Sequence, residues 1–168
     1  MAALHNGGTA SLYTSKNGDT WVHVSYMTAT GGDQSPSSGA IAGDYKYHIF
    51  NADGDFVVTA LASDSSNDVV EYLVIAGGAA GAHGGGGAGG YRTATGFTVS
   101  ASTYSITVGG GGAKTDVNAT VGGNGNNSVF STITSTGGGG GGGYYGAAAA
   151  AGASGGGGGP STTAGGAA

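Results

Sequence analysis

The chain has 168 residues, of which 41 are glycine and none is cysteine, and its 4 Lys and Arg against 9 Asp and Glu give a net charge of −5. Glycine is more than three times as frequent as the ~7% of an average protein. The acidic balance argues against nucleic-acid binding, which requires a basic surface. The lack of cysteine excludes disulfide scaffolds and cysteine-based zinc sites. No apolar run approaches the ~18 residues of a membrane-spanning helix.

Glycine and charge divide the chain near residue 76. Only 8 glycines precede residue 77 and 33 follow it, whereas Arg92, Lys114 and Asp116 are the only charged residues in the second part. We therefore predict an N-terminal β domain over residues 1–76 and a glycine-rich domain over residues 77–168.

The first part reads as a series of β-strands. Alternating apolar and polar residues predict strands, and Asn-Gly and Asp-Gly pairs are typical of the turns between them. The expected elements are a hairpin with strands 12–15 and 20–27, a loop over 30–42, and strands 45–50, 56–61 and 69–75. The last of these is almost continuously apolar, which predicts a strand that is buried on both faces.

The second part alternates short β pieces with blocks of glycine. The β pieces are residues 96–99, 104–108 and 128–133, and the blocks are 84–87, 109–112, 137–143 and 155–159. Helix periodicity is absent throughout. The predicted fold is all-β, with an N-terminal β-sandwich-like or hairpin domain followed by short strands and polyglycine-II-like segments.

Glycine blocks have two physical fates. Glycine loses the most backbone entropy on ordering, so an isolated block forms a flexible linker. Extended glycine segments can instead pack very closely because no Cβ intervenes, provided that neighbouring segments bond their N–H and C=O groups. The interspersed alanines and the scarcity of charge favour packing for residues 77–146, whereas residues 147–168 are either packed or a flexible tail.

The candidate catalytic and metal motifs lack parts of their sites. Residues 71–81 pass from a strand into a glycine-rich turn, but residues 82–87 cannot begin the helix that a dinucleotide site needs. Asn51, Asp53 and Asp55 have the spacing of a calcium loop without its sixth-position glycine or its final glutamate. The histidines lie at positions 5, 23, 48 and 83, none at ligand spacing, and we expect them at the surface or between strands. We predict no enzyme activity, no cofactor and no metal.

Three tyrosines stand out in the glycine-rich part. Tyr91 follows a glycine block, and Tyr144 and Tyr145 lie within one. Exposed tyrosine rings give a large contact area at a small entropic cost, which suits receptor binding. The same rings could instead plug the ends of the glycine packing or pair across a subunit interface, so both roles stay open.

The order of the pieces resembles a known family. The succession covers residues 44–159 and consists of residues 45–50, 54–59, 70–78, 89–92, 103–109, 124–130 and 132–137. It is similar to the glycine-rich domain that recurs in bacteriophage virion proteins. The chain departs from that pattern at Ala79, Ala80, Ala82 and His83 and in the alanine run 147–151, which puts all-glycine packing there in doubt.

The resemblance implies a structural virion protein: a tail or head fibre, a capsid decoration or an adhesin, with receptor contacts made by loops between polyglycine helices. It implies assembly in the host cytoplasm and release by lysis, in keeping with a start that lacks the features of a cleaved signal. The implied partners are other virion proteins, further copies of the chain, with a homotrimer favoured, and a host surface glycan or outer-membrane protein. Residues 1–43 lie outside the resemblance and are expected to dock on the particle. The abrupt glycine- and alanine-rich end leads us to expect a longer natural chain.

A free extracellular glycine-rich module, of the ice-binding or matrix type, is the alternative. Ice binding predicts a monomer with a flat, regular face. The unequal lengths of the glycine blocks argue against such a face.

Overall fold

The computed structural model describes residues 2–7, 26–42, 45–115, 120–160 and 164–168. Its elements, in chain order, are β1 (Ala2–Gly7), β2 (Thr28–Thr30), β3 (Ala40–Ala42), β4 (Tyr45–Phe50), β5 (Gly54–Ala60), the short 3-10 helix η1 (Ser65–Asn67), β6 (Val69–Ile75), β7 (Tyr91–Thr98), β8 (Thr103–Thr107), β9 (Ser128–Phe130) and β10 (Ile133–Ser135). The described residues contain no α-helix, so the all-β prediction is confirmed.

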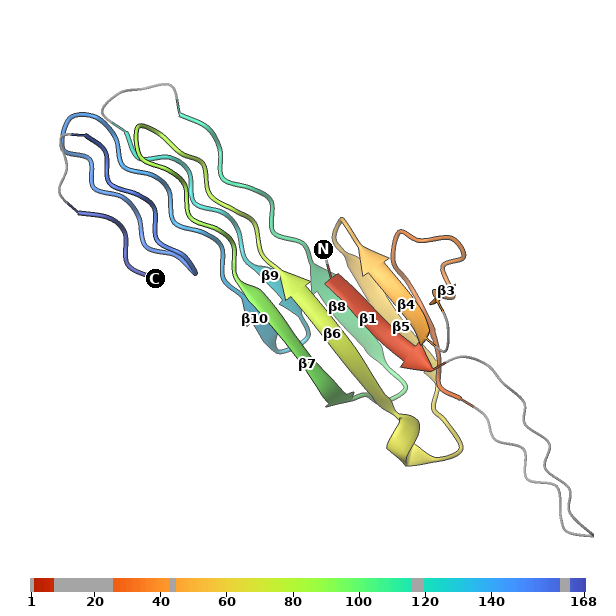
Figure 1. Ribbon diagram of the computed structural model, residues 1–168. Helices are drawn as coiled ribbons and strands as arrows, with labels where there is room; N and C mark the ends of the chain where they lie inside the picture. Colours follow the sequence, from red (N-terminus) through yellow and green to blue (C-terminus); the bar gives the residue numbers. More distant parts are fainter. Residues whose placement is uncertain (1, 8–25, 43–44, 116–119, 161–163) are drawn as a thin grey trace, which may run out of the picture.

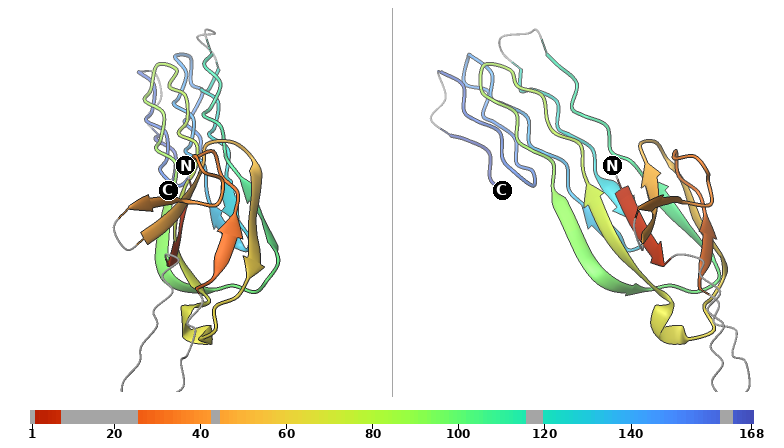
Figure 2. Two further views of the ribbon diagram at one scale, coloured as in Figure 1. Left: turned by 90° about the vertical axis from the view of Figure 1, so that its right-hand side faces the viewer. Right: turned by 45° about the vertical axis from the view of Figure 1, so that its right-hand side comes forward.

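The strands form two five-stranded antiparallel sheets that face each other (Figures 1 and 2). One sheet has the order β3-β4-β1-β6-β7 and the other β10-β9-β8-β5-β2. Each sheet combines strands from both sides of residue 76, because β7 pairs with β6 and β8 pairs with β5. The strands of the glycine-rich part therefore complete the sandwich, and the extended glycine segments continue from one end of it (Figure 1).

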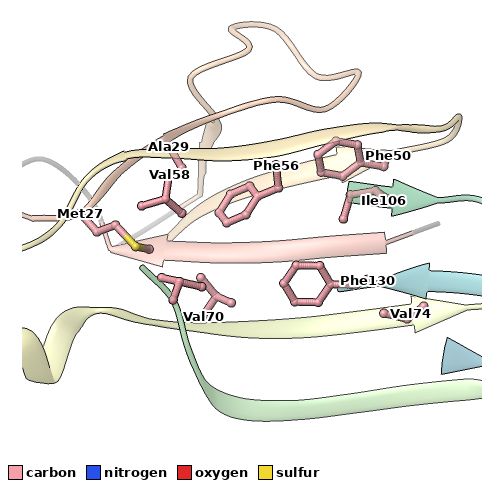
Figure 3. Close-up of a cluster of buried hydrophobic side chains, with 10 residues drawn as sticks. Met27, Ala29, Phe50, Phe56, Val58, Val70, Val74, Ile106 and Phe130 are labelled. Carbon is pink, nitrogen blue, oxygen red and sulfur yellow. The ribbon is translucent and has the colours of Figure 1, made fainter. Parts of the chain in front are cut away.

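A core of aliphatic and aromatic side chains lies between the sheets (Figure 3). Phe56 and Phe130 are fully buried, with ring centroids 6.5 Å apart in a T-shaped arrangement. Phe97 packs on Phe130 at 5.0 Å. Because β5, β7 and β9 each supply one of these rings, the core ties strands that are distant in the sequence to one another.

The predicted strands 45–50 and 69–75 coincide with β4 and β6, but the burial predicted for the latter is wrong. Val70 and Val74 point into the core, whereas Val69 and Glu71 are exposed. The opposite sheet covers only one face of β6, so its apolar run has a solvent side. The predicted hairpin over residues 12–27 lies outside the described residues except for its last two, which are not in a strand.

Several boundaries differ from the prediction. The piece 96–99 is the end of the longer strand β7, and the piece 128–133 is a hairpin of two strands, β9 and β10. The turn of that hairpin includes Ser131, whose φ of 53° is a backbone conformation that few residues other than glycine adopt. The predicted loop 30–42 holds β3 at its end.

His48 lies in this core and not at the surface as one of the expected alternatives had it. Its Nδ1 is 2.8 Å from the carbonyl oxygen of Gly31, which accepts a hydrogen bond from the ring, while Nε2 is buried without a partner. The His48 ring also meets Phe56 edge to face at 5.1 Å. Burial lowers the pKa of His48, the nearby Lys46 charge lowers it further, and the Gly31 bond opposes both.

We predict that the protein loses stability in mild acid. Below pH 6.5 the unfolded chain binds a proton at residue 48 that the folded chain, with its lowered pKa, does not, so the free energy of unfolding falls by up to about 1.4 kcal/mol per pH unit in that window. Urea unfolding between pH 8 and pH 5 measures this slope. His48→Gln should remove it, whereas His83→Gln, which changes an exposed histidine, should leave it unchanged. An equal slope in the His48→Gln variant contradicts the assignment.

Candidate functional site

Apart from strands β7–β10, the glycine-rich part is a bundle of extended segments that lie side by side (Figure 1). The segments are residues 76–82, 84–90, 109–115, 120–127, 136–143, 147–153, 154–160 and 164–168, with residues 116–119 and 161–163 outside the description. Residues 137–143, hereafter the central segment, are seven consecutive glycines, and all seven are buried. The packing of the bundle is organised around them.

The N–H groups of the central segment point in three directions with a period of three residues. Gly138 and Gly141 donate to carbonyls of segment 76–82, and Gly139 and Gly142 donate to carbonyls of segment 154–160; the acceptors are Gly77 and Ala80 for the first pair and Ser154 and Gly157 for the second. Gly137 and Gly140 donate instead to the side chains of Asn127 and Asn124, at 2.9 and 2.8 Å. A period of three is that of a polyglycine-II or polyproline-II helix.

The carbonyl groups of the central segment follow the same period. Gly138 and Gly141 accept from segment 120–127, Gly139 and Gly142 accept from segment 84–90, and Gly137 and Gly140 accept from segment 147–153. The donors, in the same order, are Gly125 and Gly122, Gly87 and Gly84, and Ala153 and Ala150. The central segment thus has five neighbouring segments, and the polyglycine-II packing predicted for the glycine-rich part is confirmed.

Packing extends into the stretches that the sequence left open. The carbonyls of Gly156 and Ala167 accept from Gly166 and Gly152, which attaches segment 164–168 to its neighbours. The amides of Ala79 and Ala80 donate to Gly87 and Gly123 in the same way as glycines elsewhere in the bundle do. Ala79 and Ala80 are half-buried, so their methyl groups are accommodated without loss of these backbone bonds.

The far end of the bundle carries a small aromatic cluster. The chain reverses there after residue 143, where Gly143 donates to the carbonyl of Ala147, and beside this turn His83 donates its backbone N–H to Gly142. The rings of His83 and Tyr144 are 5.2 Å apart, and those of Tyr144 and Tyr145 are 4.8 Å apart and nearly perpendicular. We call these three residues the tip cluster. Tyr145 is 71% exposed and Tyr144 39%.

The structure brings together two of the three predicted contact residues and separates the third. Tyr91 is 65% exposed, but it begins β7 at the sandwich end of the bundle, one segment length away from the tip cluster. His83 was not among the predicted contact residues. In the sequence, His83 is only a single large side chain between two glycine-rich stretches. Nothing in the sequence indicates that it lies beside Tyr144.

The described residues offer little else for chemistry. They contain no group of His, Cys, Asp or Glu side chains that could hold a metal ion. Within the same residues, no helix has the length and apolar character needed to cross a membrane.

Comparison with known proteins places the bundle in a family. The family model described as "Glycine-rich domain" matches residues 51–168, more than two thirds of the chain. The chain belongs to the glycine-rich domain family. The match begins at the turn before β5 and includes the whole bundle, so the family covers both the later strands and the polyglycine segments. No curated protein and no solved structure gives a significant match.

A matched pair of glycine substitutions tests the packing. A Cβ at Gly141 would lie 2.0 Å from the carbonyl oxygen of Gly84, whereas a Cβ at the exposed Gly85 would meet no atom within 4 Å. We predict that Gly141→Ala destabilises the bundle by about 2–3 kcal/mol through overpacking. Gly85→Ala should be neutral or stabilise by up to about 1 kcal/mol, because alanine restricts the unfolded chain. Denaturant unfolding of the two variants measures the difference, and equal effects would contradict close packing at the central segment.

Proposed function

We propose that this protein is a structural component of a bacteriophage virion, a fibre, capsid decoration or adhesin, and that its tip cluster contacts the host cell surface. The observation that carries the proposal is the position of the cluster. The exposed rings of Tyr144 and Tyr145 lie at the end of the bundle remote from the sandwich, where contact with another surface is least obstructed. The order of motifs that resembles phage glycine-rich domains supports the same proposal.

The construction of the bundle supports a role in presenting these residues. Its segments hold one another by backbone bonds repeated every three residues, and their glycines leave no room for side chains inside. Such a bundle is a stiff spacer, because bending it would break bonds to several neighbours at once. In this proposal residues 1–43 dock on the particle, the bundle extends outward, and the turns meet a host glycan or outer-membrane protein.

The proposal also includes the assembly of the protein. A homotrimer located in the virion, built with other virion proteins in the host cytoplasm and released by lysis, remains a prediction from the resemblance. We propose a binding and structural role with no catalytic step, because few charged groups are available for acid–base chemistry.

Electron microscopy tests the location. Intact particles from the source, labelled with a gold-conjugated antibody against residues 1–43, should carry label on fibres, at a tail tip or over the capsid. Label on fibres or at the tail tip supports a role in attachment to the host. Label spread uniformly over the capsid supports a capsid decoration protein. If particles contain the protein by immunoblot but carry no label, residues 1–43 are not accessible on the particle, which contradicts the proposed arrangement. A protein absent from the particles overturns the virion proposal in favour of the free extracellular module.

Adsorption tests the tip cluster. We predict that Tyr145→Ala weakens the equilibrium binding of the protein to host cells by about 30-fold, the effect of losing an aromatic hot spot worth about 2 kcal/mol. Tyr91→Ala is the matched control, since Tyr91 is about as exposed but lies at the other end of the bundle. Equal losses in both variants, or no loss in either, would contradict recognition by the tip.

A further inference from the structure

The ring of neighbours around the central segment has one opening. Hydrogen bonds between adjacent neighbours give their order as 120–127, 76–82, 84–90, 154–160 and 147–153. In a polyglycine-II lattice each chain has three directions for N–H groups and three for C=O groups, hence six neighbours. The missing sixth neighbour would lie between segments 147–153 and 120–127, in the direction of the Gly137 and Gly140 N–H groups.

Two asparagine side chains fill this direction. The Oδ1 atoms of Asn124 and Asn127 accept from Gly140 and Gly137, and the three-residue spacing of the asparagines matches that of the glycines. Both side chains are exposed, so they form the surface of the bundle at this position. They supply the acceptors that the carbonyls of a sixth chain would otherwise supply. Without them, two backbone donors of the central segment would lack a protein partner.

The opposite side of the bundle presents backbone carbonyl groups that could accept from the donors at the opening. Segment 84–90 is the middle one of the five neighbours, so it lies directly opposite the opening. Among the described residues, the carbonyls of Gly86 and Gly89 accept no hydrogen bond, and these two residues are again three apart. A second copy placed beside the first without rotation would bring its segment 84–90 into the opening, with these carbonyls facing Gly137 and Gly140.

We propose that Asn124 and Asn127 close the sixth lattice position and thereby prevent a second copy of this chain from inserting its segment 84–90. Such a contact would join two different surfaces of the molecule. Contacts of that kind do not close on themselves and generate open-ended assemblies. The asparagines therefore protect the bundle as charges and bulges protect the edge of a β-sheet. This role is independent of the virion function.

Replacing both asparagines by glycine tests the proposal. In Asn124→Gly/Asn127→Gly, we expect sedimentation velocity to show large species that grow with concentration, where the wild type keeps a fixed size. At concentrations too low for assembly, the Gly137 and Gly140 amides should exchange hydrogen about tenfold faster than in the wild type, as expected when a hydrogen bond of about 1.4 kcal/mol is lost. Adding Ala88→Lys, on the exposed side of segment 84–90, should restore the fixed size.

Two matched controls separate the proposal from a general effect of added glycine. Asn126→Gly changes the intervening asparagine, whose side chain makes no hydrogen bond within the described residues, and should behave as the wild type. Asn124→Asp/Asn127→Asp keeps both acceptors and should also keep the fixed size and slow exchange. Assembly by Asn126→Gly to the same extent, or a fixed size with unchanged exchange in the double glycine variant, overturns the proposal. If the double variant does not fold, Asn127→Gly alone must accelerate exchange at Gly137 and not at Gly140.

Discussion

The structure depends on the satisfaction of backbone hydrogen bonds in a bundle that has almost no side chains to bury. In the sandwich, Phe56 and Phe130 supply apolar burial, the usual source of stability. The central segment has no such source, and each of its seven N–H groups is instead bonded. Glycine is required there because close approach of backbones, and not side-chain packing, makes those bonds possible.

The sandwich lowers the entropy cost of ordering the bundle. Ordering glycine costs more backbone entropy than ordering any other residue. Segment 76–82 follows β6 directly, and segment 84–90 leads directly into β7, while β6 and β7 are paired from Val69 to Ile75. The paired strands therefore deliver two glycine segments side by side and in register, which removes most of the cost of bringing them together. The same relation holds for the paired strands β8 and β9, because β8 leads into segment 109–115 and segment 120–127 leads into β9.

The sequence predicted those elements whose formation depends on residues that are close together in the chain. Alternation identified β4, a nearly continuous apolar run identified β6, and the glycine blocks identified the bundle. The sequence could not predict the extent of β7 or the place of β1, because both depend on pairing with distant strands. The three-residue spacing of Asn124 and Asn127 indicates a role only once it is known that the segment has three residues per turn and lies beside Gly137 and Gly140. For the same reason, nothing local distinguished Tyr91 from Tyr144, or joined Tyr144 to His83.

The bundle separates the residues that hold it together from the residues proposed to contact the host. Inside it, a side chain at Gly139 or Gly141 would collide with a neighbouring carbonyl, so these positions are fixed by packing. At the turns the restriction ends: a Cβ at Gly146 would meet no atom within 4 Å, and the adjacent Tyr145 is mostly exposed. Gly146 keeps one constraint, a φ of 80° that favours glycine. Side chains at the turns can thus differ in size and chemistry without disturbing the lattice that carries them. The tip cluster, which we propose as the contact surface, lies at such positions.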